Sequence, residues 1–315
     1  MSARIRAQLE RYLALRRALG SHMDVHERLL HDFVEFLETR SSCEPLRAQH
    51  AVDWACATAR GLRSGAAAHR LSVVRGFLSH LRATAPDTEI PGHHLLPKTP
   101  RRTPHIYSNS EILSLIDAAS ALRSRDPLRA HTVATVIGLL AGTGLRAAEA
   151  LRLRIADVAL DHQIPLLRII DTKFRKSRLV PLHRSAVAPL ACYARRRRSL
   201  HPDEACDRFF VSAKGESFPY RSLSWHFVAL ARELGLRSPV GERGACLHDL
   251  RHTFAVNRLL SWYCDGEDVY ARLPELSIYL GHARPQNTYW YLSATPRLLE
   301  VAARRFELHA SGAQP

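Results

Sequence analysis

The sequence predicts a mainly α protein with a small antiparallel β-sheet, divided into two domains by a linker. Three observations indicate this class. Apolar residues recur at helical spacing over most of the 315 residues, two short β-strand candidates interrupt them in the second half, and five prolines gather between Thr84 and Ser110. One domain usually takes roughly 100–200 residues, so the chain is long enough for two.

Residues 1–83 are predicted to form an N-terminal helical domain. The first twenty residues are Arg-rich and amphipathic, and we interpret them as its first helix rather than as a targeting peptide. Two further apolar stripes follow at helical spacing. The stripes consist of Val25, Leu29, Phe33, Phe36 and Leu37, and of Leu71, Val74, Phe77, Leu78 and Leu81.

Residues 84–107 are predicted to form an extended, semi-rigid linker. Proline is excluded from helix interiors and central strands, and it recurs through this segment together with Lys98, Arg101 and Arg102. Such a basic segment either acts as a simple spacer or follows a polyanion between two domains.

Residues 108–308 are predicted to form the second domain, which opens with a helix capped by Ser108 or Ser110 before Glu111. The glycines of Gly142-Thr143-Gly144 permit a tight turn between two helices. Further helices are expected at 131–141, 145–151, 186–198, 223–234, 247–262, 274–280 and 296–308.

The β-strand candidates of this domain are Leu166–Asp171 and Arg178–Leu182. They are rich in β-branched and aliphatic residues, and the polar segment 172–176 between them is short enough for the tip of a hairpin. Residues 309–315 are predicted to be a flexible tail.

The charge of the chain indicates a polyanionic partner. Lys and Arg number 45 against 30 Asp and Glu, which gives a net charge of +15. Basic side chains replace condensed counterions along a nucleic-acid backbone, so this balance favours DNA binding over a merely solubilising charge. Six scattered cysteines without a CxxC pair indicate a reducing compartment and no zinc site. No apolar stretch reaches the roughly 18 residues of a membrane span, so we expect a cytoplasmic protein that contacts no membrane.

A possible phosphate-binding site is spread over the second domain. His248 and Arg251 are three residues apart and so lie on one face of a helix. Arg146 precedes Glu149 by the same spacing, and the carboxylate is placed to orient the guanidinium. Two arginines can stabilise the extra negative charge of a five-coordinate phosphorus, because their planar forks keep their protons. This chemistry needs neither a metal ion nor another cofactor.

Tyr291 is the candidate nucleophile of this site. It follows His282 by nine positions, and this spacing favours it over Tyr289. A cationic pocket and a neutral histidine would help a phenol to ionise, and attack on a phosphodiester would give a phosphotyrosine ester. The sugar oxygen must leave with a proton. Lys173 lies at the predicted hairpin tip and is the expected general acid.

The motifs together resemble those of the tyrosine recombinases, the phage integrase family. They are TGLRAAEALRL, TKFRKSRLVPLH, LHDLRH and LGH, followed by Tyr291. The resemblance implies catalytic roles for Arg146, Lys173, His248, Arg251, His282 and Tyr291. It also implies a helical core-binding (SAM-like) domain and a catalytic domain that form a C-shaped clamp around double-stranded DNA. Four protomers would assemble on two sites with inverted repeats, with accessory or sister recombinases as possible partners.

Two features depart from the family pattern. The interval from Arg251 to His282 is long, with the excess around Ser261–Pro274, where we expect an extra loop or a helix extension. Bulky Phe174 follows Lys173 where a small residue is common, which leaves Lys176 as a second candidate for the general acid.

The favoured function is a site-specific recombinase or integrase encoded by a mobile element, acting through a 3′-phosphotyrosine intermediate. A transposase-like member and a chromosome-dimer resolvase are alternatives within the family. A type IB topoisomerase shares the chemistry, and a DNA-binding regulator without catalysis is an alternative of another class. A further hypothesis is that the apolar side of helix 296–308 docks on a neighbouring protomer.

Overall fold

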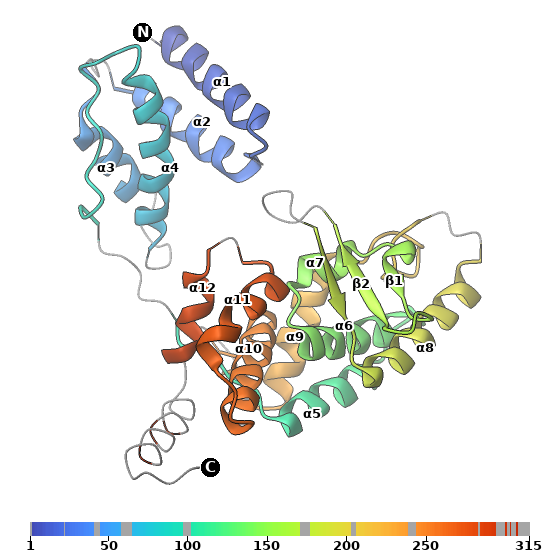
Figure 1. The fold of residues 1–315 in the computed structure, drawn as a ribbon. Helices are drawn as coiled ribbons and strands as arrows, with labels where there is room; N and C mark the ends of the chain where they lie inside the picture. Colours follow the sequence, from blue (N-terminus) through green and yellow to red (C-terminus); the bar gives the residue numbers. More distant parts are fainter. Residues whose placement is uncertain are drawn as a thin grey trace. The chain divides into compact units, whose positions relative to one another are not determined.

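The computed structural model describes residues 2–21, 23–40, 45–57, 65–96, 102–170, 177–202, 206–238, 244–282 and 284–293, together with Glu300, Ala303 and Glu307. The chain forms two compact units, Met1–Arg102 and Thr103–Pro315 (Figure 1). Most of the described residues are helical, and the β-strands belong to the second unit. This confirms the predicted class of a mainly α protein with a small antiparallel sheet.

In its described part, the first unit is a bundle of helices. They are α1 (Ser2–Ala18), α2 (Asp24–Glu38), α3 (Ala48–Ala57) and α4 (Ala66–Leu81). Trp54 of α3 is fully buried and its ring meets Phe33 of α2 edge to face, with the centroids 5.3 Å apart. The stripe predicted from Leu71 to Leu81 is entirely buried, whereas Val25 is exposed because it lies in the first turn of α2, away from the core.

The segment that follows α4 packs on the same unit. The backbone N–H of Glu89 donates to the carbonyl oxygen of Leu46, and Thr88 is buried. Arg75 of α4 donates to the carbonyl oxygens of Pro91 and Gly92. Residues 84–96, which the sequence placed in the linker, are therefore held against the first unit, and the two units divide between Arg102 and Thr103.

The second unit is built around α6. This helix contacts α5, α7, α8, α9 and α10, and most of its side chains are buried. The described helices of this unit are α5 (Asn109–Ser120), α6 (Arg129–Thr143), α7 (Ala147–Arg152), α8 (Arg184–Leu200), α9 (Tyr220–Glu233), α10 (Leu247–Cys264), α11 (Val269–Leu280) and α12 (Gln286–Tyr289), with short 3-10 turns η1 (Ile155–Asp157) and η2 (Trp290–Ser293). Ser108 caps α5 and forms a capping box with Glu111, so Ser108 and not Ser110 is the cap.

A three-stranded antiparallel sheet lies beside α7 in Figure 1. Its strands are β1 (Val158–Ala159), β2 (Leu166–Ile169) and β3 (Arg178–Pro181), in the order β1-β2-β3. Leu167 pairs with Val180, and both are fully buried, which fixes the register. The two predicted strands are confirmed. The two-residue strand β1 was not predicted because it is too short to show an alternating pattern.

The long interval before His282 is largely helical. Helix α10 continues to Cys264, a turn with Gly266 at positive φ follows, and α11 begins at Val269. The expected helix extension is therefore confirmed. The start predicted at Pro274 is wrong, because Asp268 caps the helix by accepting from the backbone N–H groups of Tyr270 and Ala271.

Three predicted segments lie wholly or largely outside the described residues. These are the hairpin tip 172–176, the tail 309–315 and, apart from three positions, the C-terminal helix 296–308. Among the helices that the structure describes, none is long and apolar enough to cross a lipid bilayer.

Candidate active site

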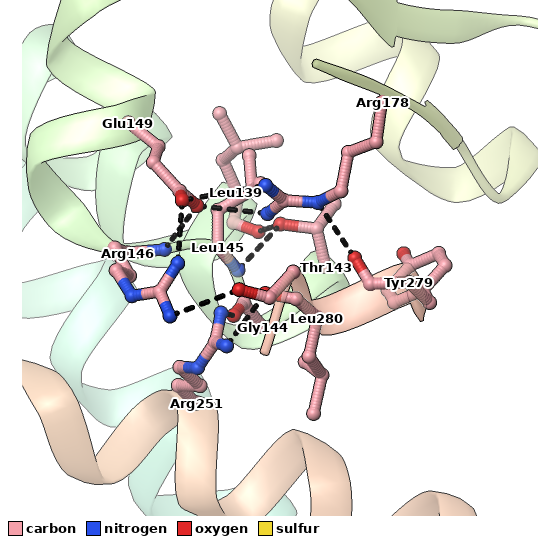
Figure 2. A network of polar contacts seen from close by, with 11 residues as sticks. Leu139, Thr143, Gly144, Leu145, Arg146, Glu149, Arg178, Arg251, Tyr279 and Leu280 are labelled. Atoms are coloured by element: carbon pink, nitrogen blue, oxygen red, sulfur yellow. Dashed lines mark hydrogen bonds and ion pairs between the residues drawn. The ribbon is translucent and has the colours of Figure 1, made fainter. Parts of the chain in front are cut away.

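The turn between α6 and α7 places Arg146 at the site. Gly144 ends α6 with a φ of 61°, and a Cβ atom there would lie 2.6 Å from the ring of Phe254, so only glycine allows this close packing. Arg146 immediately precedes α7. Its Nη1 donates to Glu149 Oε1 at 2.7 Å, and its Nη2 donates to the carbonyl oxygen of Gly281 at 3.2 Å (Figure 2).

Arg251 lies on α10 and is 1% exposed. Its Nη1 donates to the carbonyl oxygen of Gly144 at 2.8 Å, and its Nη2 donates to that of Leu280 at 2.6 Å, as Figure 2 shows. Burial, and then the charge of Arg146, lower the pKa of Arg251 to about 10. The guanidinium therefore remains charged at neutral pH, and its plane is fixed by the ends of α6 and α11.

Glu149 joins Arg146 to a third arginine, Arg178 of β3 (Figure 2). Arg178 Nη2 donates to Glu149 Oε2 at 2.8 Å, and Arg178 Nε donates to the carbonyl oxygen of Tyr279. Both side chains of this ion pair are more than nine-tenths buried. Burial opposes the ionisation of Glu149, but the hydrogen bonds and charges of Arg178 and Arg146 together outweigh it, so the pKa of Glu149 lies below its ordinary value.

His282 follows the glycine that ends α11. Gly281 has a φ of 67°, which turns the chain back toward Arg146 and Arg178. Burial, then the charges of Arg251 and Arg146, lower the pKa of His282 to about 3. Its imidazole is therefore neutral at physiological pH.

Tyr291 lies on η2 and is 2% exposed. Its ring stacks on that of His282, with the centroids 6.1 Å apart and the planes 21° apart. Tyr289, the alternative nucleophile, is 47% exposed. The structure thus brings Tyr291 into the site and leaves Tyr289 largely at the surface.

His252 connects the other predicted histidine to the tyrosine. The ring centroid of His248 lies 4.8 Å from that of His252, and His252 lies 5.4 Å from Tyr291. His252 was not predicted from the sequence, although it follows Arg251 directly. Arg178 was also missed, because its role depends on contacts with α7 and α11 that no local pattern reveals.

Five of the six predicted site residues therefore meet. Arg251 interacts electrostatically with Arg146 and with Tyr291, and His282 interacts with both arginines and with His248. The remaining predicted residue, Lys173, and its alternative Lys176 lie outside the described residues. The assembled part is a cationic cradle with a phenol at one side, and this arrangement suits an anionic phosphate ester.

A helical unit followed by a cradle of arginine, histidine and tyrosine defines a class of protein that acts on phosphodiesters. The chain belongs to the phage integrase family, the tyrosine recombinases, which are enzymes that cleave and rejoin DNA. The profile of the phage integrase family matches residues 107–297.

Two relatives illustrate the likeness in sequence. The putative integrase/recombinase y4rB of Sinorhizobium fredii is 39% identical over 307 residues, which cover 96% of this chain and 96% of the relative. The tyrosine recombinase XerD of Caulobacter vibrioides is 30% identical over 239 residues, which cover 74% of this chain and 72% of XerD.

Solved structures share the fold. The XerH site-specific recombinase bound to a palindromic difH substrate has a TM-score of 0.68 at 20% identity, over 98% of this chain and 85% of that chain. The Tn1549 transposon integrase in complex with transposon right end DNA has a TM-score of 0.66 at 14% identity, over 96% of this chain and 98% of that chain.

Proposed function

We propose that this protein is a site-specific DNA recombinase of a mobile element, which cleaves and rejoins DNA through a 3′-phosphotyrosine intermediate. The observation that carries the proposal is the meeting of Arg146, Arg251, His282 and Tyr291. These residues come from the α6–α7 turn, α10, the end of α11 and η2, and their side chains converge on one buried cradle.

Arg146, Arg251 and His282 would bind the scissile phosphate. Two backbone carbonyls hold the Arg251 guanidinium in one plane, so its remaining N–H groups have a fixed direction. Arg146 is oriented in the same way by Glu149 and Gly281. Preorganised donors of this kind stabilise the charge that develops on the non-bridging oxygens.

Transfer of the strand then follows as an exchange of esters. The oxygen of Tyr291 forms a bond to phosphorus, and the bond from phosphorus to the 5′ oxygen breaks. A neutral imidazole, from His248 or His252, takes the phenolic proton, and Lys173 gives a proton to the leaving 5′ oxygen. The positive charge of Arg251 favours the phenolate form of Tyr291. Attack by a second 5′ hydroxyl reverses these steps and reseals DNA without an added energy source.

The proposed partner is double-stranded DNA with inverted recognition sites. The net charge of +15 supports a phosphate-backbone contact, and solved relatives include one on a palindromic substrate and one on transposon DNA. We place the first unit as the core-binding domain of a clamp and the second as the catalytic domain. Four protomers, bound in pairs to inverted half-sites, would form the exchanging assembly.

A chromosome-dimer resolvase is the second candidate. The likeness to the tyrosine recombinase XerD favours this alternative. The higher identity to an integrase/recombinase over nearly the whole chain favours the mobile element. Recombination in cells between sites from the DNA flanking the gene, compared with recombination between chromosome-terminus sites, separates the two.

The test of the chemistry is a covalent trap. Nicked duplexes that tile the DNA flanking the gene release a short fragment on cleavage, so religation is prevented and the protein–DNA adduct accumulates. We expect an adduct with the wild-type protein and with Tyr289→Phe, and none with Tyr291→Phe. Retention of DNA binding by Tyr291→Phe shows that the variant is folded. An adduct that persists in Tyr291→Phe would refute the assignment, and a DNA-binding regulator would give no adduct with any variant.

A further inference from the structure

A buried threonine connects His282 to the segment that carries the tyrosine. Thr288 lies on α12, three residues before Tyr291, and is 1% exposed. Its Oγ1 lies 2.7 Å from Nδ1 of His282, and its backbone N–H donates to the carbonyl oxygen of Pro285. This side-chain hydrogen bond joins His282, two residues after the end of α11, to the helix before Tyr291.

The direction of this hydrogen bond decides which nitrogen of His282 carries the proton. A neutral imidazole has one N–H donor and one acceptor. The oxygens of a phosphodiester that surround phosphorus accept hydrogen bonds, so His282 can contact them only through an N–H group. Because Nδ1 faces Thr288, the nitrogen left for phosphate is Nε2. This requires that Nδ1 accepts a hydrogen bond from the threonine hydroxyl.

Doubly protonated His282 could also donate from Nε2, but its surroundings disfavour that form. The ring is partly buried, and Arg251, Arg146 and Arg178 add positive charge around it. A neutral imidazole can carry its proton on either nitrogen, and the hydrogen bond from the hydroxyl of Thr288 selects the tautomer. A hydrogen-bond partner of this kind orients the ring as well as selecting the proton position.

We propose that Thr288 is a positioning residue that holds His282 as the Nε2–H tautomer and couples phosphate binding to the seating of the tyrosine segment. The use of Nε2 on phosphate rests on the proposed function, whereas the tautomer is a property of the free protein. Thr288 and Tyr291 belong to one short segment. Withdrawal of that segment would take away the nucleophile and release the phosphate-binding imidazole in the same movement.

Removal of the hydroxyl tests the proposal. Thr288→Val keeps the shape of the side chain and loses the donor, whereas Thr288→Ser keeps the donor. The matched control is Thr132→Val, which alters an equally buried threonine on α6 that bonds Tyr193 and Leu128. We expect Thr288→Val to slow single-turnover DNA cleavage about 10- to 100-fold, with Thr288→Ser and Thr132→Val within about threefold of wild type. DNA affinity should stay within about twofold, since most phosphate contacts remain.

The second measurement does not depend on DNA. Nitrogen NMR of isotope-labelled histidine reports the tautomer, and the His282 signal is assigned from its loss in His282→Gln. We expect wild type and Thr288→Ser to show the Nε2–H form, and Thr288→Val to show a mixture. An Nδ1–H wild type, or an unchanged single tautomer in Thr288→Val, would overturn the proposal. A wild type that never cleaves DNA but shows the Nε2–H form would overturn the proposed function and leave the tautomer assignment standing.

Discussion

Arg251 is the most tightly constrained side chain of the candidate site. It is one of the largest fully buried side chains in the described part of the chain, and its guanidinium binds two carbonyls from two different helices. A lysine carries its donors on one nitrogen and cannot span both carbonyls while it also contacts a phosphate. The geometry of the site therefore depends on arginine, and not simply on a positive charge.

Arg251→Lys tests this dependence on the planar fork. We expect single-turnover cleavage to fall by about 10²- to 10³-fold, which is the usual effect of losing one preorganised donor to a developing anion. The control is Arg258→Lys, which alters an exposed arginine two turns further along α10. Similar rates for the two variants would mean that Arg251 supplies only charge.

The neutral state of His282 predicts a dependence of stability on pH. Its pKa is about 3 in the folded protein and about 6.5 in an unfolded chain. Between these values the unfolded chain binds a proton that the folded protein does not, so the free energy of unfolding rises with pH. Above about pH 6.5 neither state binds this proton, and His282 causes no further change in stability. Wild type should therefore lose more stability than His282→Gln as pH falls from neutral toward 5. Urea unfolding at a series of pH values measures this, and parallel curves for the two proteins would contradict it.

At the scale of elements, the Glu149–Arg178 ion pair fastens β3 to α7. The same arginine binds the carbonyl oxygen of Tyr279, so the strand is also attached to α11. Strand β3 follows the predicted hairpin tip 172–176, which lies outside the described residues. The two attachments hold the start of β3 beside the arginine cradle.

Arg178→Ala should destabilise the second unit. The substitution leaves a buried carboxylate with Arg146 as its remaining partner in the network, and breaking a buried pair costs about 3 kcal/mol. Arg154→Ala is the control, because its ion pair with Asp207 is exposed on both sides and such pairs contribute less than about 1 kcal/mol. Urea unfolding gives both free energies of unfolding, and equal losses would show that the buried pair has no special role.

Gly281 allows the close approach of α11 to Arg178. It has a φ of 67°, and an added Cβ atom would lie 2.6 Å from Arg178 Nη1. Gly281→Ala therefore combines backbone strain with a displaced guanidinium, and strain alone costs about 1–3 kcal/mol. Gly235→Ala isolates the strain, because Gly235 has a φ of 70° and no atom within 4 Å of the added Cβ. We expect the Gly281 variant to lose more stability, and also to cleave DNA more slowly because Arg146 binds the carbonyl oxygen of Gly281. Equal stability losses would contradict the steric account.

Local patterns in the sequence were sufficient to predict most elements of the second unit. The apolar periodicity predicted α10, and the short run of aliphatic residues at Leu166–Ile169 predicted β2. The start of α11 was missed because Pro274 was taken as a boundary, although a capping aspartate can begin a helix several residues before a proline. Helix α12 and η2 are too short to show a period, so the position of Tyr291 beside His282 had to come from the structure.

At the scale of the whole molecule, the sequence predicted two parts and a boundary rich in proline. It did not reveal that residues 84–96 pack on the first unit, because this depends on contacts such as that of Glu89 with Leu46. The predicted site residues are distributed over about 145 positions of the sequence, from Arg146 to Tyr291. Their order could be read from motifs, whereas their convergence is a property of the folded second unit.

The central claim is that Tyr291 takes over a DNA phosphate inside this cradle. The most direct test is mass spectrometry of the protein–DNA adduct after digestion with protease and nuclease. We predict a single modified peptide, with a nucleotide joined through its 3′ phosphate to the oxygen of Tyr291. A nucleotide on Tyr289 or on any other residue, or attachment through a 5′ phosphate, would contradict the claim.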